Sequence, residues 1–189
     1  MRNILLDIQN RTAFREWLIE HGKTESECWI IVERGDPQDD EHFWFIDAVE
    51  EALCFGWIDG MQKKIDGVWF QRFSRRKHFM PWSELDKERV RRLKKLGLMT
   101  NTGWSKFPFK KNAGFILDPD IEKALKDAEL WETFTGFPPL YQRVSAWNIT
   151  YYKEKFPGMY RKCLRQFLDE TGKGNMYGEW NDYGRLVDY

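Results

Sequence analysis

A tight turn in the middle of the chain constrains the fold more than any other feature. Asp66-Gly67 separates two short segments, residues 63–65 (KKI) and residues 68–70 (VWF). An Asp-Gly pair between such segments is typical of a two-residue hairpin, because both turn positions require positive φ. The sequence therefore predicts an antiparallel β-hairpin over residues 57–73.

The segments on both sides of this hairpin are predicted to form helices, one further strand and a loop. Apolar residues three and four apart, with capping residues at the ends, predict helices over about 12–21, 45–55 and 83–96. Thr12 is the expected N-cap of the first helix and Ser83 that of the third. A run of β-branched and aromatic residues predicts a buried strand over 28–32. Residues 101–117, rich in Gly, Pro and Lys, are expected to form an ordered loop or a short strand.

The C-terminal part of the chain is predicted to be helical. Asp118-Pro119 combines a capping residue with a proline at the first helical position, and further helices are expected near 139–155 and 157–170. The tail from Gly172 has no clear period and is interpreted as a strap over the core, with a pocket lining as the alternative. The resulting fold class is α+β: a small, largely antiparallel sheet with packed helices, then a helical C-terminal half. We expect two regions, 1–111 and 112–189, packed as one compact unit.

The formal net charge is zero, but the charges are divided unequally along the chain. Residues 1–60 hold 5 basic and 14 acidic side chains, a net charge of −9, whereas residues 61–111 hold 15 basic and 4 acidic ones, a net charge of +11. Two interpretations are open. Either the basic segment is neutralised within the molecule by the acidic one, or part of it serves an anionic partner.

Composition narrows the class of protein further. No segment approaches the roughly 18 consecutive apolar residues of a membrane span, so we expect a cytoplasmic protein without membrane insertion. The three cysteines are far apart and odd in number, which argues against a secreted disulfide framework. Neither they nor the three histidines have metal-ligand spacing, so the sequence predicts no metal and no cofactor. The oligomeric state is left open.

The segment ALCFGWIDG, residues 52–60, is the most distinctive motif. The chain resembles the YdeI/OmpD-associated family, also called bacteriocin-protection proteins, over about residues 12–105, with an atypical C-terminal portion. Further matches follow in the same order: Phe14-x-x-Trp17-Leu18, Arg72-Phe73-Ser74-x-Arg76, Trp82-Ser83 and Gly97-x-Met99-x-x-x-Gly103. The resemblance implies a bacterial protein with a role in tolerance of antimicrobial peptides or stress. It supplies no established catalytic residue.

The residues that follow the hairpin are the preferred candidates for a ligand site. Arg72, Arg75 and Arg76 precede Trp82 and Ser83, which stand at an expected helix start. Guanidinium groups bind phosphate and carboxylate oxygens bidentately, and a helix N-terminus favours anions. The sequence therefore predicts that these five residues bind an anionic, phosphate-bearing small molecule. The alternative is that the arginines pair with the acidic side chains of residues 1–60.

Two other functions are kept as alternatives, and whether the protein is an enzyme is left open. Cys54 and Asp59, where the second helix meets the hairpin, would serve an enzyme as thiolate nucleophile and general base. Their structural alternatives are an inert buried thiol and a turn carboxylate. Basic residues interleaved with rings over 70–109 also fit a single-stranded nucleic-acid partner. The near-neutral isoelectric point and the lack of a nucleic-acid-binding motif disfavour that partner.

Overall fold

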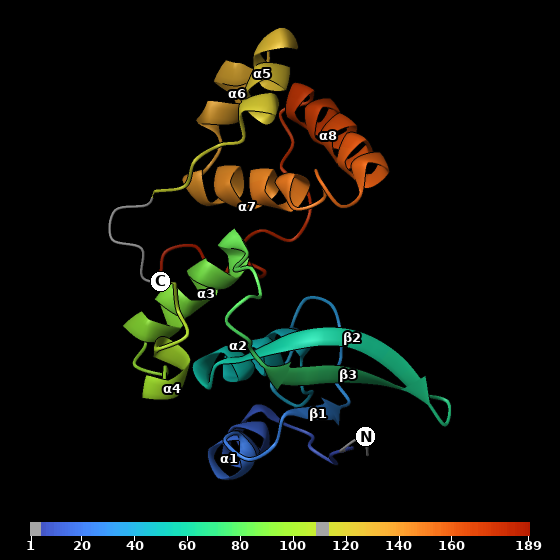
Figure 1. The fold of residues 1–189 in the computed structure, drawn as a ribbon, viewed down its shortest axis with the longest axis vertical. Helices are drawn as coiled ribbons and strands as arrows, with labels where there is room; N and C mark the ends of the chain where they lie inside the picture. Colours follow the sequence, from blue (N-terminus) through green and yellow to red (C-terminus); the bar gives the residue numbers. More distant parts are fainter. Residues whose placement is uncertain (1–4, 109–113) are drawn as a thin grey trace. The chain divides into compact units, whose positions relative to one another are not determined.

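A computed structural model describes residues 5–108 and 114–189, which form two compact units (Figure 1). Of these residues, the first unit contains 5–81 and 86–108, and the second contains 82–85 and 114–189. The α+β class predicted from the sequence is confirmed, because the described residues include a three-stranded antiparallel sheet and the C-terminal half is helical. None of the described helices is both long and apolar enough to cross a bilayer.

The sheet is built around the predicted hairpin. β2 (Trp57–Ile65) and β3 (Val68–Arg75) are joined by Asp66 and Gly67, whose φ values of 48° and 87° are those that an Asp-Gly turn requires. β1 (Glu27–Ile30) pairs antiparallel with the base of β3, so the strand order is β1-β3-β2. The outer half of the hairpin consequently extends past β1 (Figure 1).

Two helices of the first unit pack together and bury aromatic side chains against the sheet. These are α1 (Arg11–His21) and α2 (Phe45–Cys54). Phe14 of α1 and Phe73 of β3 are fully buried, with ring centroids 5.4 Å apart. The ring contact ties α1 to the middle strand of the sheet, and it removes two large apolar surfaces from water.

The N-cap predicted for α1 is wrong. The capping side chain is Asn10, whose Oδ1 accepts a hydrogen bond from the backbone N–H of Ala13 at 2.9 Å. Asn10 has the extended backbone of an N-cap, and Thr12 lies inside the first turn. Asn and Thr both cap helices, so the residue type alone does not show which of the two positions is the N-cap.

The loop or strand expected over residues 101–117 begins with a helical turn instead; its residues 109–113 lie outside the described part of the chain. After α3 (Glu84–Lys95), the short helix α4 (Asn101–Trp104) is capped by Thr100, whose hydroxyl accepts from Gly103 N–H at 3.1 Å. The same hydroxyl donates to the carbonyl oxygen of Cys54 at 2.6 Å. A Cβ built on Gly103 would lie 2.1 Å from that oxygen. Only glycine therefore allows α4 to pack this closely on the end of α2.

The described residues of the second unit form four further helices, and one of these helices was not predicted from the sequence. They are α5 (Pro119–Asp127), the unexpected α6 (Trp131–Gly136), α7 (Pro139–Thr150) and α8 (Pro157–Gly172). α5 begins as predicted, with Asp118 as its cap and Pro119 in its first turn. The core contains Phe134, Tyr141 and Phe167, and Trp180 of the tail packs edge-on against Tyr141 at 5.7 Å. The tail therefore lies on this core.

We expect Gly103→Ala to destabilise the protein by about 2–4 kcal/mol, because the backbone of α4 must move away from α2 to admit a methyl group. Chemical denaturation followed by circular dichroism measures this change. Gly60→Ala is the matched control, since its Cβ would meet Arg72 only at 3.6 Å or more and its effect should stay within about 1 kcal/mol. Equal effects of the two substitutions would contradict the close packing.

Candidate functional site: an arginine-lined cavity on two buried glutamates

The predicted arginines of β3 lie on different faces of the sheet. Neighbouring strand residues point to opposite faces, so Arg72 and Arg75, three positions apart, are separated. Arg72 donates from Nε and Nη2 to Glu27 Oε2, at 2.9 and 2.5 Å, and this pairing lowers the pKa of Glu27. Arg75 donates from Nη1 to the backbone carbonyl of Lys23 at 3.1 Å. The structure thus does not bring these two side chains to one site.

Arg76, the third predicted arginine, is buried directly after β3. Its Nη2 donates to Asp86 Oδ2 at 2.9 Å, and its Nη1 donates to the carbonyl of Pro81 at 2.9 Å. Trp82 and Ser83, the other predicted ligands, belong to the second unit, whereas the three arginines belong to the first. An anion site at these five residues stays a prediction.

Cys54 ends α2 and is fully buried. Burial raises the pKa of Cys54 to about 12, and the charge of Glu51 acts in the same direction, although Arg15 acts against it. The thiol is therefore protonated at neutral pH. This favours the inert, structural interpretation of Cys54 over a nucleophilic one.

Asp59 lies on β2, where its side chain is half-buried. Burial raises the pKa of Asp59, and the negative charge of Asp86 adds to the shift, while Arg89 and Arg76 oppose it. A carboxyl with a raised pKa favours its neutral form, so ionisation of Asp59 destabilises the folded chain.

We expect Asp59→Asn to stabilise the protein at pH 7 and to have little effect near pH 3. The folded state binds the Asp59 proton more tightly than the unfolded chain does, because the folded pKa is raised. The protonated Asp59 carboxyl contributes its full share of stability at pH values below its pKa in the unfolded chain. That contribution is lost as the pH rises through its pKa in the folded state. Unfolding midpoints of the two proteins between pH 3 and pH 8 measure the effect. A variant that is less stable than the parent at pH 7 would contradict it.

The main charged cluster of the first unit is centred on α2. Glu50 and Glu51 are 0 % and 2 % exposed, although both are glutamates. They are buried because α2 is apolar at most other positions and is covered on nearly all sides. A buried carboxylate must be paired, since an isolated charge in the interior is very costly. Glu50 and Glu51 therefore require cationic partners.

Three arginines supply these partners and form an alternating chain of charges. Arg11 donates from Nη1 to Glu50 Oε2 at 2.9 Å and from Nε to Glu51 Oε1 at 2.6 Å. Arg92 of α3 donates to the other oxygen of Glu50 at 2.5 Å, and Arg15 to the other oxygen of Glu51 at 2.6 Å. Each carboxylate is thus shared by two guanidinium groups. The two glutamates connect α1, α2 and α3 of the first unit.

The same side chains line a cavity of about 270 Å³, with Thr12 and Leu98 completing its wall. Arg11, Arg15 and Arg92 keep 34 %, 30 % and 18 % of their side chains exposed, whereas the glutamates beneath them are buried. The three arginines are therefore the charged side chains of the cavity wall that remain partly exposed. In the described part of the chain, Glu50 is the one hydrogen-bond partner of the Arg92 guanidinium, which leaves its Nε and Nη2 available.

The electrostatics of the cluster keep its arginines charged, and Asp47 also contacts Arg11, with Nη1 3.3 Å from Oδ1. Burial works against the charge of Arg11, but Glu50 and Glu51 outweigh it and raise the pKa of Arg11 above its usual value. Burial likewise opposes the charge of Arg15, and Glu51 again raises the pKa. Arg11 and Thr12 are also the first two residues of α1, where backbone N–H groups lack intrahelical acceptors and the helix dipole is positive.

The residues of this site are not among those predicted from the sequence, although two signals for them are present there. Arg11 and Arg15 are four residues apart on one predicted helix, so they share a face. Glu50 and Glu51 interrupt a helix that is otherwise mostly apolar, and such a helix is buried. Carboxylates on a buried helix require cationic partners, which indicates that arginines or lysines lie against Glu50 and Glu51. Which cations meet that need depends on the tertiary fold, because Arg92 is more than forty positions away.

The chain belongs to a family described as a domain of unknown function (DUF8412), whose model matches residues 6–106. The arginine-lined cavity lies entirely within this domain. No curated protein and no solved structure matched the chain. The resemblance to the YdeI/OmpD-associated family stays a prediction. In the described residues, no group of three or more His, Cys, Asp or Glu side chains is arranged to hold a metal ion.

We expect Glu50→Gln to lower the free energy of unfolding by about 1–3 kcal/mol. An amide keeps the size of the side chain but cannot accept charged hydrogen bonds from both Arg11 and Arg92 as a carboxylate does. Urea denaturation measures the loss. Glu20→Gln on α1 is the control, because that side chain is 77 % exposed and its replacement should change stability by no more than about 0.5 kcal/mol. A loss at Glu50 no larger than at Glu20 would contradict the role of the buried pair.

Proposed function

We propose that the protein binds an anionic, phosphate-bearing small molecule in the cavity lined by Arg11, Arg15 and Arg92. The observation that carries this proposal is the arrangement of three guanidinium groups around one cavity, fixed from beneath by two buried carboxylates. Guanidinium groups held in this way need little reorganisation to bind a ligand, so less side-chain entropy is lost on binding.

The chemistry of the cavity wall supports phosphate as the charged group of the ligand. Arg92 has Nε–H and Nη2–H groups to offer, and this edge of a guanidinium matches two oxygens of one phosphate. Arg11 uses Nε and Nη1 for the glutamates, which leaves Nη2 for a further acceptor. The hydroxyl of Thr12 adds a neutral donor.

The size of the cavity favours a small molecule over a nucleic-acid strand. A volume of about 270 Å³ is just below the range of roughly 300–1,000 Å³ for small-ligand pockets. A single-stranded nucleic acid would need a groove that follows several phosphates, with rings on which bases stack. Among the described residues that line the cavity there is no Trp, Tyr or Phe.

Calorimetric titration with inorganic phosphate and pyrophosphate tests the proposal, with sodium chloride at equal ionic strength as the salt control. We expect saturable binding that weakens as salt is added. Arg92→Gln should weaken pyrophosphate binding roughly ten- to hundredfold, because it removes a charged hydrogen-bond donor.

Arg72→Gln is the matched control, since Arg72 pairs with Glu27 on the sheet and does not line the cavity. It should leave pyrophosphate binding unchanged. Binding that is lost in Arg72→Gln and kept in Arg92→Gln would move the ligand site to β3. If neither anion binds more tightly than chloride, the arginine–glutamate cluster has a structural role alone.

A further inference from the structure

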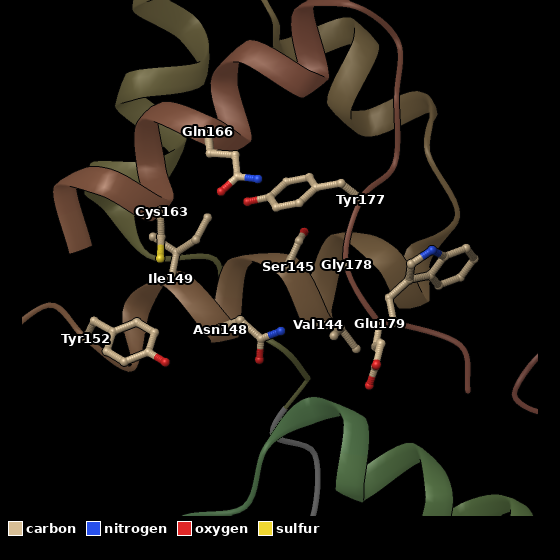
Figure 2. Close-up of a pocket in the computed structure, with 11 residues that line it drawn as sticks. Val144, Ser145, Asn148, Ile149, Tyr152, Cys163, Gln166, Tyr177, Gly178 and Glu179 are labelled. Carbon is tan, nitrogen blue, oxygen red and sulfur yellow. The ribbon is translucent and has the colours of Figure 1, made fainter. Parts of the chain in front are cut away.

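A second cavity lies within the second unit, between α7, α8 and the C-terminal tail (Figure 2). Its volume is about 140 Å³, which is close to that of an engineered protein cavity of about 150 Å³ that holds benzene. Figure 2 shows the side chain of Tyr177 reaching from the tail between the two helices, with its hydroxyl turned toward the amide of Gln166. One ring of six atoms fits a space of this size.

The wall of this cavity combines apolar surface with neutral hydrogen-bonding groups. Val144 and Ile149 of α7 supply apolar surface, and Trp180 supplies a ring. Asn148 of α7 and Gln166 of α8 contribute carboxamides, each with two donors and an acceptor. Asn148 and Gln166 are exposed and Tyr177 is half-buried, and no described protein group is hydrogen-bonded to either amide or to the Tyr177 hydroxyl, so all three are available to a ligand.

The charges at this cavity differ from those at the arginine-lined one. Among the described residues that line it, Glu179 is the one carboxylic acid, and there is no lysine or arginine. Burial raises the pKa of Tyr177, and the neighbouring Tyr141, Cys163 and Glu170 act in the same direction, so its hydroxyl stays a neutral donor. A negatively charged ligand would meet the Glu179 carboxylate without a cation to offset it.

We propose that this cavity binds an uncharged, single-ring molecule with hydrogen-bond donors and acceptors on its edge, such as a pyrimidine base or a ring bearing a carboxamide. The carboxamides of Asn148 and Gln166 pair with the edge of the ring, as Asn and Gln amides pair with base edges. The Tyr177 hydroxyl donates to a ring carbonyl, and Trp180 contacts the ring. This site is independent of the proposed anion site, because all its residues belong to the second unit.

Ligand-observed NMR with the full-length protein tests the proposal with three probes, uracil, nicotinamide and nicotinate. Uracil and nicotinamide are neutral rings with polar edges, whereas nicotinate replaces the carboxamide by a carboxylate of nearly the same shape. We expect at least one of the two neutral probes to bind saturably and at least tenfold more tightly than nicotinate, because Glu179 repels the carboxylate. Absence of binding by both neutral probes, or nicotinate binding as tightly as nicotinamide, would overturn the proposal.

Two substitutions locate the bound ring. Gln166→Leu and Tyr177→Phe each remove polar atoms with little change of volume, and each should weaken binding roughly tenfold. Gln62→Leu, on the exposed part of β2, is the matched control and should leave binding unchanged. Circular dichroism establishes that each variant is folded. Binding that persists unchanged in both Gln166→Leu and Tyr177→Phe would overturn the assignment, whatever the affinity of the parent protein.

Discussion

The pairing of two buried glutamates with three arginines is the interaction on which the first unit depends. Glu50 and Glu51 are carried into the interior by a helix that is apolar on most sides, and their burial is tolerated because each oxygen accepts a charged hydrogen bond. The cations come from α1 and α3, so the requirement for pairing fixes where these helices lie against α2. Packing of Phe14 on Phe73 then joins the helices to the sheet.

The same pairing explains how a structural cluster can present a binding surface. Buried carboxylates hold three guanidinium groups at the wall of the cavity, and Arg15 also donates from Nη2 to the carbonyl of Leu98 at 2.9 Å. A cation so held loses little freedom when a ligand binds. The pairing also explains part of the uneven distribution of charge along the chain. Arg72 and Arg92 of the basic segment pair with Glu27 and Glu50 of the acidic one, yet Arg92 retains donors for an external anion.

The local features of the fold were predictable from the sequence. The Asp66-Gly67 turn, the α+β class and the start of α5 all rest on residues close together in the chain, where turn and capping chemistry decide the outcome. The helix α6 was missed because its six residues are too few for a periodic pattern. The N-cap of α1 was misplaced because Asn10 and Thr12 are both competent caps.

The candidate site was less predictable, for two physical reasons. Arg72 and Arg75 are close in the chain, but strand alternation places them on opposite faces of β3. The cavity arginines come instead from α1 and α3, and only tertiary contacts across α2 bring them together. The sequence held two clues: the shared helix face of Arg11 and Arg15, and the position of Glu50 and Glu51 in a mostly apolar helix.

The nitrogen-15 NMR signals of the arginine side chains, recorded during addition of pyrophosphate, test this assignment most directly. If the cavity holds the anion, the Nε–H signal of Arg92 shifts and saturates, because that group is available in the free protein. The Nε–H signal of Arg72, already donated to Glu27, stays unchanged. A saturating shift of Arg72 with none at Arg92, or no saturating shift at any arginine, would contradict an anion site built on the two buried glutamates.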